Sequence, residues 1–273
     1  MTYLMGLIIG AVLGLTGAGG SVFAVPMLMM LLALEPQQAI GVSLGSVSLC
    51  SAYGVMISIK SRQIMWLPAT WFAIVGSLFT PAGTYLNQLI STPILLSSFA
   101  ILVVIVAARM WRQANQQPND TTVVRASQPE KSTDNTVLCR VNNFQPFKIG
   151  PRCVISMSIA ASITGVLSGL FGVGGGFLIV PTLLFLTNIS MRQAVATSLF
   201  VITLITGSGF ISYLVLGNAV SPSLLYQIAA GGMVGMTLGV ISSKKIAGPK
   251  LQKIFSILML CMAAVVIKQA INL

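Results

Sequence analysis

Long apolar runs alternate with short polar stretches along nearly the whole chain. Several of these runs are long enough to cross a hydrocarbon core of roughly 30 Å as helices. They lie near residues 38–59, 66–89, 93–111, 153–171, 193–216, 221–243 and 251–271. This pattern predicts an all-α, polytopic membrane protein.

Two apolar regions, 2–34 and 153–188, are interrupted by glycines, and the second of them includes the run 153–171. The first contains "GLTGAGGSVFAVP" (Gly14–Pro26) and the second "GLFGVGGGFLIVP" (Gly169–Pro181), so the same G-L-x-G-x-G-G-x4-V-P order recurs 155 positions later (169 − 14). A continuous helix over 2–34 would be about 50 Å long, which exceeds one membrane crossing. We therefore expect each region to fold back as a hairpin of two short helices, entering and leaving on the same side.

The recurrence divides the chain into two membrane halves, 1–111 and 151–273. Between them, residues 112–150 are polar and rich in Asn, Gln, Pro, Ser and Thr. Such a segment buries too little apolar area to fold alone, so it is interpreted as a linker. We expect the two halves to form one transport unit, because neither is expected to enclose a site by itself.

The charges bear on partners and orientation. Only 7% of the residues are charged, too few to cover the surface of a soluble domain, and the net charge is +11. The basic residues lie in loops and the linker rather than on a helical face, which favours membrane lipid over nucleic acid as a partner. With folded-back hairpins, every Lys and Arg except Lys268 falls on one side. The positive-inside rule then predicts a cytoplasmic linker, both termini outside, and two inverted repeats, each a hairpin plus three transmembrane helices.

A broken helix inside a membrane frees backbone N–H and C=O groups, which is costly unless the break lines a cavity. The helices that restart near 18–21 and 173–176 would point unpaired N–H groups and a positive dipole end into that cavity, which favours an anion. The candidate ligands at the two breaks are Gly17, Gly19, Gly20, Ser21, Gly172, Gly174, Gly175 and Gly176. The alternative is that the glycines only allow close helix packing, which is the interpretation favoured for Gly10, Gly14, Gly165 and Gly169.

Hydroxyl side chains on the next helix of each half extend the candidate site. Ser43, Thr197 and Ser198 are expected at about the depth of the breaks, where they could complete an anion shell. The alternative is that they bond carbonyl groups of their own helices, as Ser and Thr in membrane helices often do.

Several kinds of chemistry lack the residues they need. No acidic or basic side chain falls in the middle of a predicted span, so a carboxylate proton relay is not expected. The chain has no histidine, and its four cysteines lack metal-ligand spacing, so neither a metal nor a cofactor is expected. No nucleophile with its base is present, which argues against an enzyme.

The paired glycine motifs, each followed by "QQAIGVSL" or "RQAVATSL", resemble those of the TauE/SafE (sulfite exporter, TSUP) family of membrane permeases. The resemblance covers nearly the whole chain apart from the linker. It implies transport of a sulfur-containing anion such as sulfite or a sulfonate, usually as export across the bacterial inner membrane. Ser21 stands where the second half has Gly176, and Gly41–Val42 where it has Ala196–Thr197, so the two half-sites are expected to be unequal.

The sequence thus predicts a secondary transporter, an anion permease whose substrate-binding residues come from both breaks. Two alternatives stay open. One is a channel-like anion pathway without alternating access, and the other is a non-transporting membrane subunit or sensor that uses the linker for docking. A homo-oligomer also stays open.

Overall fold

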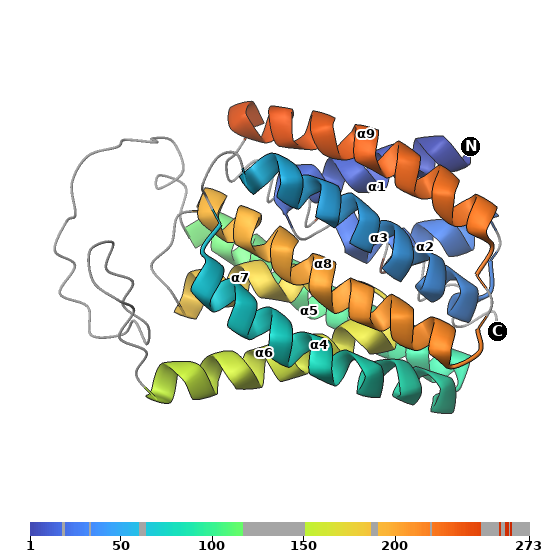
Figure 1. The fold of residues 1–273 in the computed structure, drawn as a ribbon, viewed down its shortest axis with the longest axis horizontal. Coiled ribbons are helices and arrows are strands. Elements are labelled where there is room, and N and C mark those ends of the chain that lie inside the picture. Colours follow the sequence, from blue (N-terminus) through green and yellow to red (C-terminus); the bar gives the residue numbers. More distant parts are fainter. Residues whose placement is uncertain are drawn as a thin grey trace, which may run out of the picture.

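A computed structural model describes residues 1–17, 20–32, 34–59, 64–116, 151–186, 191–218 and 220–246, with residues 257, 260, 261 and 263. Within these residues the secondary structure consists of α-helices, without a strand (Figure 1). The predicted all-α class is therefore confirmed. The predicted last span, 251–271, falls almost entirely outside the described residues, as does the linker from residue 117 onward.

Five helices precede the linker and four follow it. The first five are α1 (Thr2–Thr16), α2 (Gly20–Leu32), α3 (Pro36–Ile59), α4 (Trp66–Leu89) and α5 (Thr92–Gln116). The other four are α6 (Pro151–Phe171), α7 (Gly176–Leu186), α8 (Met191–Val215) and α9 (Pro222–Ile246). Helix α5 thus continues past residue 112, where the linker was predicted to begin, whereas α6 begins at the predicted boundary.

Four of the described helices, α3, α6, α8 and α9, are long and apolar enough to cross a membrane. Helix α4 has the predicted bounds and a sufficient length but does not belong to this group. It buries the polar side chains of Thr80, Thr84 and Asn87. Helices α1 and α2, and residues 92–108 of α5, are apolar but shorter.

Both glycine-rich regions are broken where the sequence predicts. Helix α1 ends at Gly17, whose φ of 69° is left-handed, and α2 begins at Gly20. Helix α6 ends before Gly172, and α7 begins at Gly176. The two pairs differ in length, because α6 has 21 residues and α1 has 15.

The helices of the two halves begin at opposite ends of the molecule. In Figure 1, α1 begins at the end marked N, whereas α6 begins at the other end. Helices α4 and α8 begin, and α3, α5 and α9 end, at the same end as the start of α6. We call these the N-terminal end and the linker end.

Close helix pairs join the halves. Helix α1 packs along α9, α6 packs along α4, and α3 crosses α8. At the first pair Gly10 lies against the backbone of Gly232, and at the second Gly165 lies against the backbone of Gly76. A side chain at Gly10 or Gly165 would separate the two helices of its pair, so the prediction that Gly10 and Gly165 serve packing is confirmed. Gly14 and Gly169 likewise face backbone atoms of α9 and α4.

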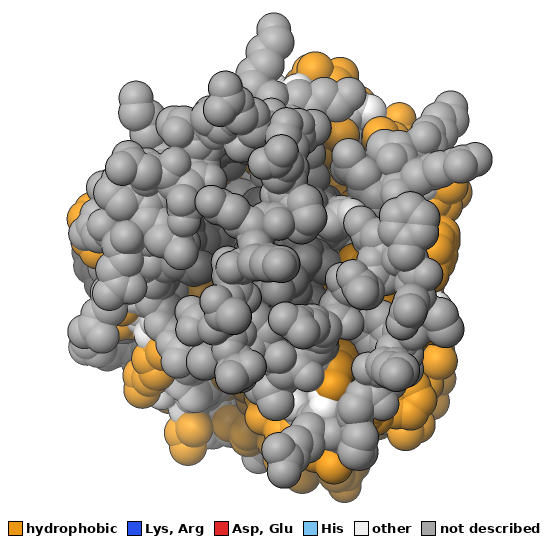
Figure 2. Space-filling model, turned by 90° about the vertical axis from the view of Figure 1, so that its left-hand side faces the viewer, with side chains coloured by type: hydrophobic (Ala, Val, Ile, Leu, Met, Phe, Trp, Pro, Cys, Tyr) orange, Lys and Arg blue, Asp and Glu red, His pale blue; other side chains and the backbone are white. Residues whose placement is uncertain are grey.

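The polarity of the molecule is inverted relative to a water-soluble protein. Large apolar side chains are exposed on the outside, including Leu78 at 74% and Val215 at 81%. Where Figure 2 is not covered by grey residues, the visible surface is mostly hydrophobic. Hydroxyl side chains such as Ser43, Ser198 and Thr206 are fully buried. This distribution suits a helical protein surrounded by lipid, with its polar groups satisfied inside.

Candidate functional site

The two glycine breaks are joined to the crossing of α3 and α8 by reciprocal hydrogen bonds. The Ser43 hydroxyl on α3 donates to the carbonyl oxygen of Gly172 at 2.9 Å. The Ser198 hydroxyl on α8 donates to the carbonyl oxygen of Gly17 at 2.8 Å. Ser43 and Ser198 are 155 residues apart, as are Gly17 and Gly172, so the two bonds are equivalent. Each half therefore holds the break of the other half.

These bonds assign a structural task to two of the predicted hydroxyls. Both serines are fully buried, and each places its hydroxyl hydrogen on a carbonyl that the broken helix leaves exposed. The Ser198 hydroxyl also lies 2.8 Å from the carbonyl oxygen of Val195 in its own helix. Thr197 is buried too, and its hydroxyl oxygen accepts a bond of 3.2 Å from the backbone N–H of Met65 at the start of α4. Contact between these hydroxyls and an anion stays a prediction.

The first break is closely packed against α8 and α1. A Cβ on Gly17 would come within 2.9 Å of the Cα of Val195. A Cβ on Gly20 would lie 2.5 Å from the backbone nitrogen of Leu13 in α1. Ser21, the second residue of α2, is fully buried. Gly19 lies outside the described residues, so its predicted role is not addressed by the structure.

The second break has a different environment. Gly172, Gly174 and Gly175 all have left-handed φ values, 67°, 70° and 63°. Residues with a side chain rarely adopt this backbone conformation, which explains why the segment needs glycine. A Cβ on Gly174 would lie 2.6 Å from the methyl group of Thr206, and one on Gly175 would lie 2.5 Å from that of Thr164. The hydroxyl-bearing residues Thr164 and Thr206 therefore lie beside the glycines of the second break.

Helix α7 begins directly after this break. The N–H groups of Leu178 and Ile179 bond to the carbonyl oxygen of Gly175. The N–H groups that precede them, including that of Gly176, have no acceptor within the helix because no turn comes before them. The positive end of the α7 dipole thus lies at the predicted ligands Gly174, Gly175 and Gly176.

Ser168 on α6 was not among the predicted site residues. It is fully buried beside the second break, and its Cβ lies 3.5 Å from the position that a Cβ on Gly175 would take. Among the buried side-chain oxygen and nitrogen atoms of the described residues, the Ser168 hydroxyl is the one that has no hydrogen-bond partner. The available signal was a serine immediately before the second glycine motif, where the first half has Leu13.

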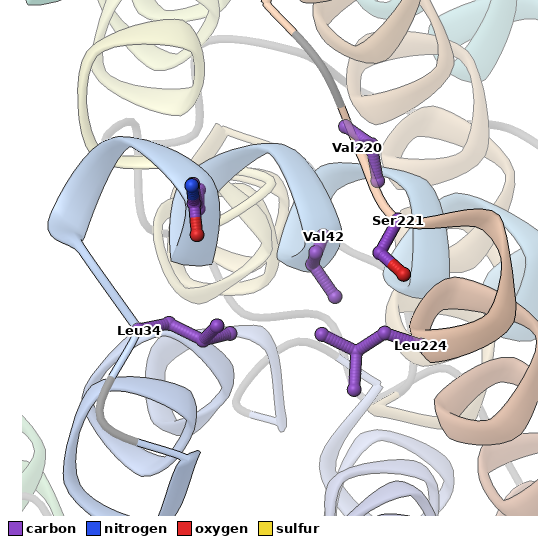
Figure 3. Close-up of a pocket in the computed structure, with 6 residues that line it drawn as sticks. Leu34, Val42, Val220, Ser221 and Leu224 are labelled. Atoms are coloured by element: carbon purple, nitrogen blue, oxygen red, sulfur yellow. The ribbon is translucent and has the colours of Figure 1, made fainter.

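A pocket of about 330 Å³ opens at the N-terminal end (Figure 3). It is lined by Leu34, Gln38, Val42, Val220, Ser221 and Leu224. In Figure 3 the side chains of Leu34, Val42 and Leu224 point into the same gap. The pocket lies between the first turns of α3 and the start of α9.

At the corresponding place of the linker end, described residues are in direct contact. The positions equivalent to Val42 and Val220 are Thr197 (42 + 155) and Met65 (220 − 155), and a hydrogen bond joins these two residues. Beside them the rings of Trp66 and Phe200 pack edge to face, with centroids 5.3 Å apart. Among the described residues, the pocket at one end is thus matched by direct contacts at the equivalent positions of the other.

The buried region between the ends carries no described charge. Glu35, at the turn between α2 and α3, is the one acidic or basic residue whose side chain the structure describes, and it is exposed. An anion in this region would be held by backbone N–H groups, hydroxyls and helix dipoles rather than by a cation.

Comparisons with known proteins agree with this architecture. The family model described as "Sulfite exporter TauE/SafE" matches residues 2–266. A probable membrane transporter protein of Xylella fastidiosa is 30% identical, over 95% of this chain and 91% of its own. The probable membrane transporter protein YunE of Bacillus subtilis is 26% identical, over 98% and 96% of the two chains. No solved structure gives a significant match.

Proposed function

Because the chain belongs to the sulfite exporter TauE/SafE family, we propose that it is a permease that exports a small sulfur-containing anion such as sulfite or a sulfonate. The family and the names of its relatives make the chain a membrane transporter. The anionic substrate and the direction of transport are the proposal. We propose no enzymatic activity.

The observation that carries the proposal is the joining of two broken helices at a buried, uncharged crossing. The Ser43–Gly172 and Ser198–Gly17 bonds tie both breaks to the α3–α8 crossing. A break in this position places unpaired N–H groups and a positive helix end where a desolvated anion could lie. The proposed ligands are backbone groups at one or both of these breaks, and Ser43 and Ser198 hold the breaks in place.

The difference between the two ends supports alternating access over a continuous channel. A channel needs a path that is open at both ends at once. Here the Val42–Val220 pocket at the N-terminal end coexists with the Thr197–Met65 contact at the linker end. We propose that transport exchanges these two arrangements, as expected for halves with inverted orientation.

The charge pattern supplies an orientation for this cycle. We propose that the linker end faces the cytoplasm, because the sequence predicts that the Lys and Arg residues other than Lys268 lie on that side, and that both termini lie outside. By the family resemblance, the membrane is the inner membrane of a bacterium. The Val42–Val220 pocket would then open to the outside.

A transport assay with purified protein in proteoliposomes tests the proposal. We expect saturable flux of at least one of sulfite, thiosulfate, taurine and sulfoacetate, with a carboxylate such as acetate as the comparison anion. Gly175→Asp should abolish this flux, since a carboxylate beside the α7 N-terminus repels an anion. Flux that rises without saturation would support a channel instead. Absence of flux for every anion, in protein shown to be folded, would support a non-transporting subunit.

A further inference from the structure

We propose that the anion binds at the second break only, with the Ser168 hydroxyl as a donor beside the N-terminus of α7. This inference rests on the proposed function and makes it more specific. It names a side chain and one half of the protein as the place where the charge of the substrate is held.

The state of Ser168 is the first step. A serine in a helix of a membrane protein normally donates its hydroxyl to the carbonyl three or four residues earlier. Thr164, one turn before Ser168 on α6, does this by bonding the carbonyl oxygen of Ala160 at 2.6 Å. Ser168 is fully buried, and its hydroxyl has no hydrogen-bond partner within the described residues, although its backbone carbonyl accepts a bond of 2.9 Å from the N–H of Gly172. An unpaired buried hydroxyl is costly, so its retention needs a partner that is present only part of the time.

The surroundings of Ser168 identify the kind of partner. Its Cβ faces Gly175, the residue directly before the 11-residue helix α7. The first N–H groups of α7 lack intrahelical acceptors, and Ser168 lies beside the residue that precedes them. Donors without a nearby acceptor, at the positive end of a helix, are the requirements of an anion.

The first half has no equivalent of this hydroxyl. Position 13, equivalent to Ser168 (168 − 155), is Leu13, and position 9, equivalent to Thr164, is Ile9. Gly20, equivalent to Gly175, is pressed against the backbone of α1 at these two residues. At the position equivalent to Ser168 the first break therefore has an apolar side chain in place of a hydroxyl, and we assign this break to packing rather than to binding.

The donor set also limits the charge of the ligand. The described residues around the second break include hydroxyls and backbone N–H groups but no cation. Partial charges of this kind compensate the desolvation of a single negative charge better than that of two. The ligand class is therefore a monoanion with a small oxygen-bearing head, such as a sulfonate. The methyl groups of Thr164 and Thr206 fill the space beside the glycines, so binding requires the segment Gly172–Gly175 to move away from them.

The variant Ser168→Ala tests this assignment through two measurements: anion affinity, which should fall, and thermal stability without the anion, which should not. Anion affinity is measured by isothermal titration of purified protein with methanesulfonate, and with sulfate as the dianion. We expect methanesulfonate affinity to fall roughly ten- to a hundredfold, the effect of losing one hydrogen bond to a charged group. Thermal stability without the anion should stay equal or rise, because an unpaired buried hydroxyl has been removed. Sulfate should bind wild-type protein more weakly than methanesulfonate.

Thr164→Val is the matched control. Thr164 lies beside the same glycine, but its hydroxyl is already bonded to Ala160, so methanesulfonate affinity should change less than about threefold. If Ser168→Ala leaves affinity within threefold while wild-type protein binds and transports, the role of Ser168 is refuted and the proposed function stands. If wild-type protein binds and transports none of the tested anions, both proposals fall.

Discussion

The hydroxyl of Ser43 lies 2.9 Å from the carbonyl oxygen of Gly172, a residue of the other half. Its counterpart, Ser198, makes the same bond to Gly17. A membrane helix that stops inside the protein leaves carbonyl groups without partners, and here each half supplies the missing donor to the other. Each break therefore depends on the other half for this bond.

Removing either hydroxyl should destabilise the protein by a similar amount. Ser43→Ala and Ser198→Ala each leave a buried glycine carbonyl with one donor fewer, at an expected cost of about 1–2 kcal/mol in the free energy of unfolding. Unfolding in mixed detergent, followed by circular dichroism, measures this. Ser97→Ala is the control, because Ser97 is exposed and bonds its own helix. Equal stability of all three variants and wild type would contradict the bonding shown here.

Alanine variants of these hydroxyl residues also show whether the hydroxyls bind the anion or only hold the two breaks in place. If Ser43, Thr197 and Ser198 contact the substrate, each change to Ala should lower anion affinity roughly ten- to a hundredfold. If they act through the breaks alone, we expect changes below about threefold in protein that remains folded. We expect the smaller effect for Ser43→Ala, because its hydroxyl hydrogen is held by Gly172. Titration with sulfite measures the difference.

Replacing a left-handed glycine at the second break by alanine should lower the free energy of unfolding. For Gly172→Ala we expect a loss of about 2–4 kcal/mol, since the left-handed backbone costs about 1–2 and the new Cβ would lie 2.9 Å from the Cα of Ile40. Gly217→Ala isolates the backbone contribution. Gly217 has a φ of 82° but nothing within 4 Å of a built Cβ, so only about 1 kcal/mol should be lost. Similar losses in both variants would show that packing at Ile40 contributes nothing.

The glycine motifs predicted the positions of the two helix breaks. Local chemistry was enough for this prediction, because repeated glycines in an apolar run indicate where helices stop. The same reasoning separated packing glycines such as Gly10 from those at the break. It could not find Ser168, whose importance depends on which face of α6 meets α7. The donation from Ser43 to Gly172 was equally hidden, because the residues are far apart in the sequence and only the fold joins them.

The orientation of the chain gives a prediction that does not depend on the substrate. A protease site placed in the linker, between residues 117 and 150, should be cut only from the cytoplasmic side of membrane vesicles. A tag before Thr2 should be accessible only from outside, because α1 begins at the end opposite to the start of α6. Finding both sites on the same side would remove the argument for inverted halves.

The closed contact at the linker end should control access from the cytoplasm. Ser221 is exposed at the open pocket, whereas Met65, equivalent to Val220, donates its N–H to Thr197. In protein whose native cysteines are replaced by serine, Ser221→Cys should react with a membrane-impermeant thiol reagent from outside. Met65→Cys should react slowly from inside.

Weakening that contact should shift the balance between the two arrangements. Thr197→Val keeps the shape of the side chain but removes the acceptor of the Met65 N–H, a change of about 1 kcal/mol that corresponds to roughly a fivefold shift in population. Labelling of Met65→Cys from inside should therefore accelerate severalfold, and labelling of Ser221→Cys from outside should slow. Thr70→Val on α4 is the control, since Thr70 bonds only its own helix and should change neither rate. Parallel acceleration at both ends would indicate general loosening, and unchanged rates would mean that Thr197 does not hold the linker end closed.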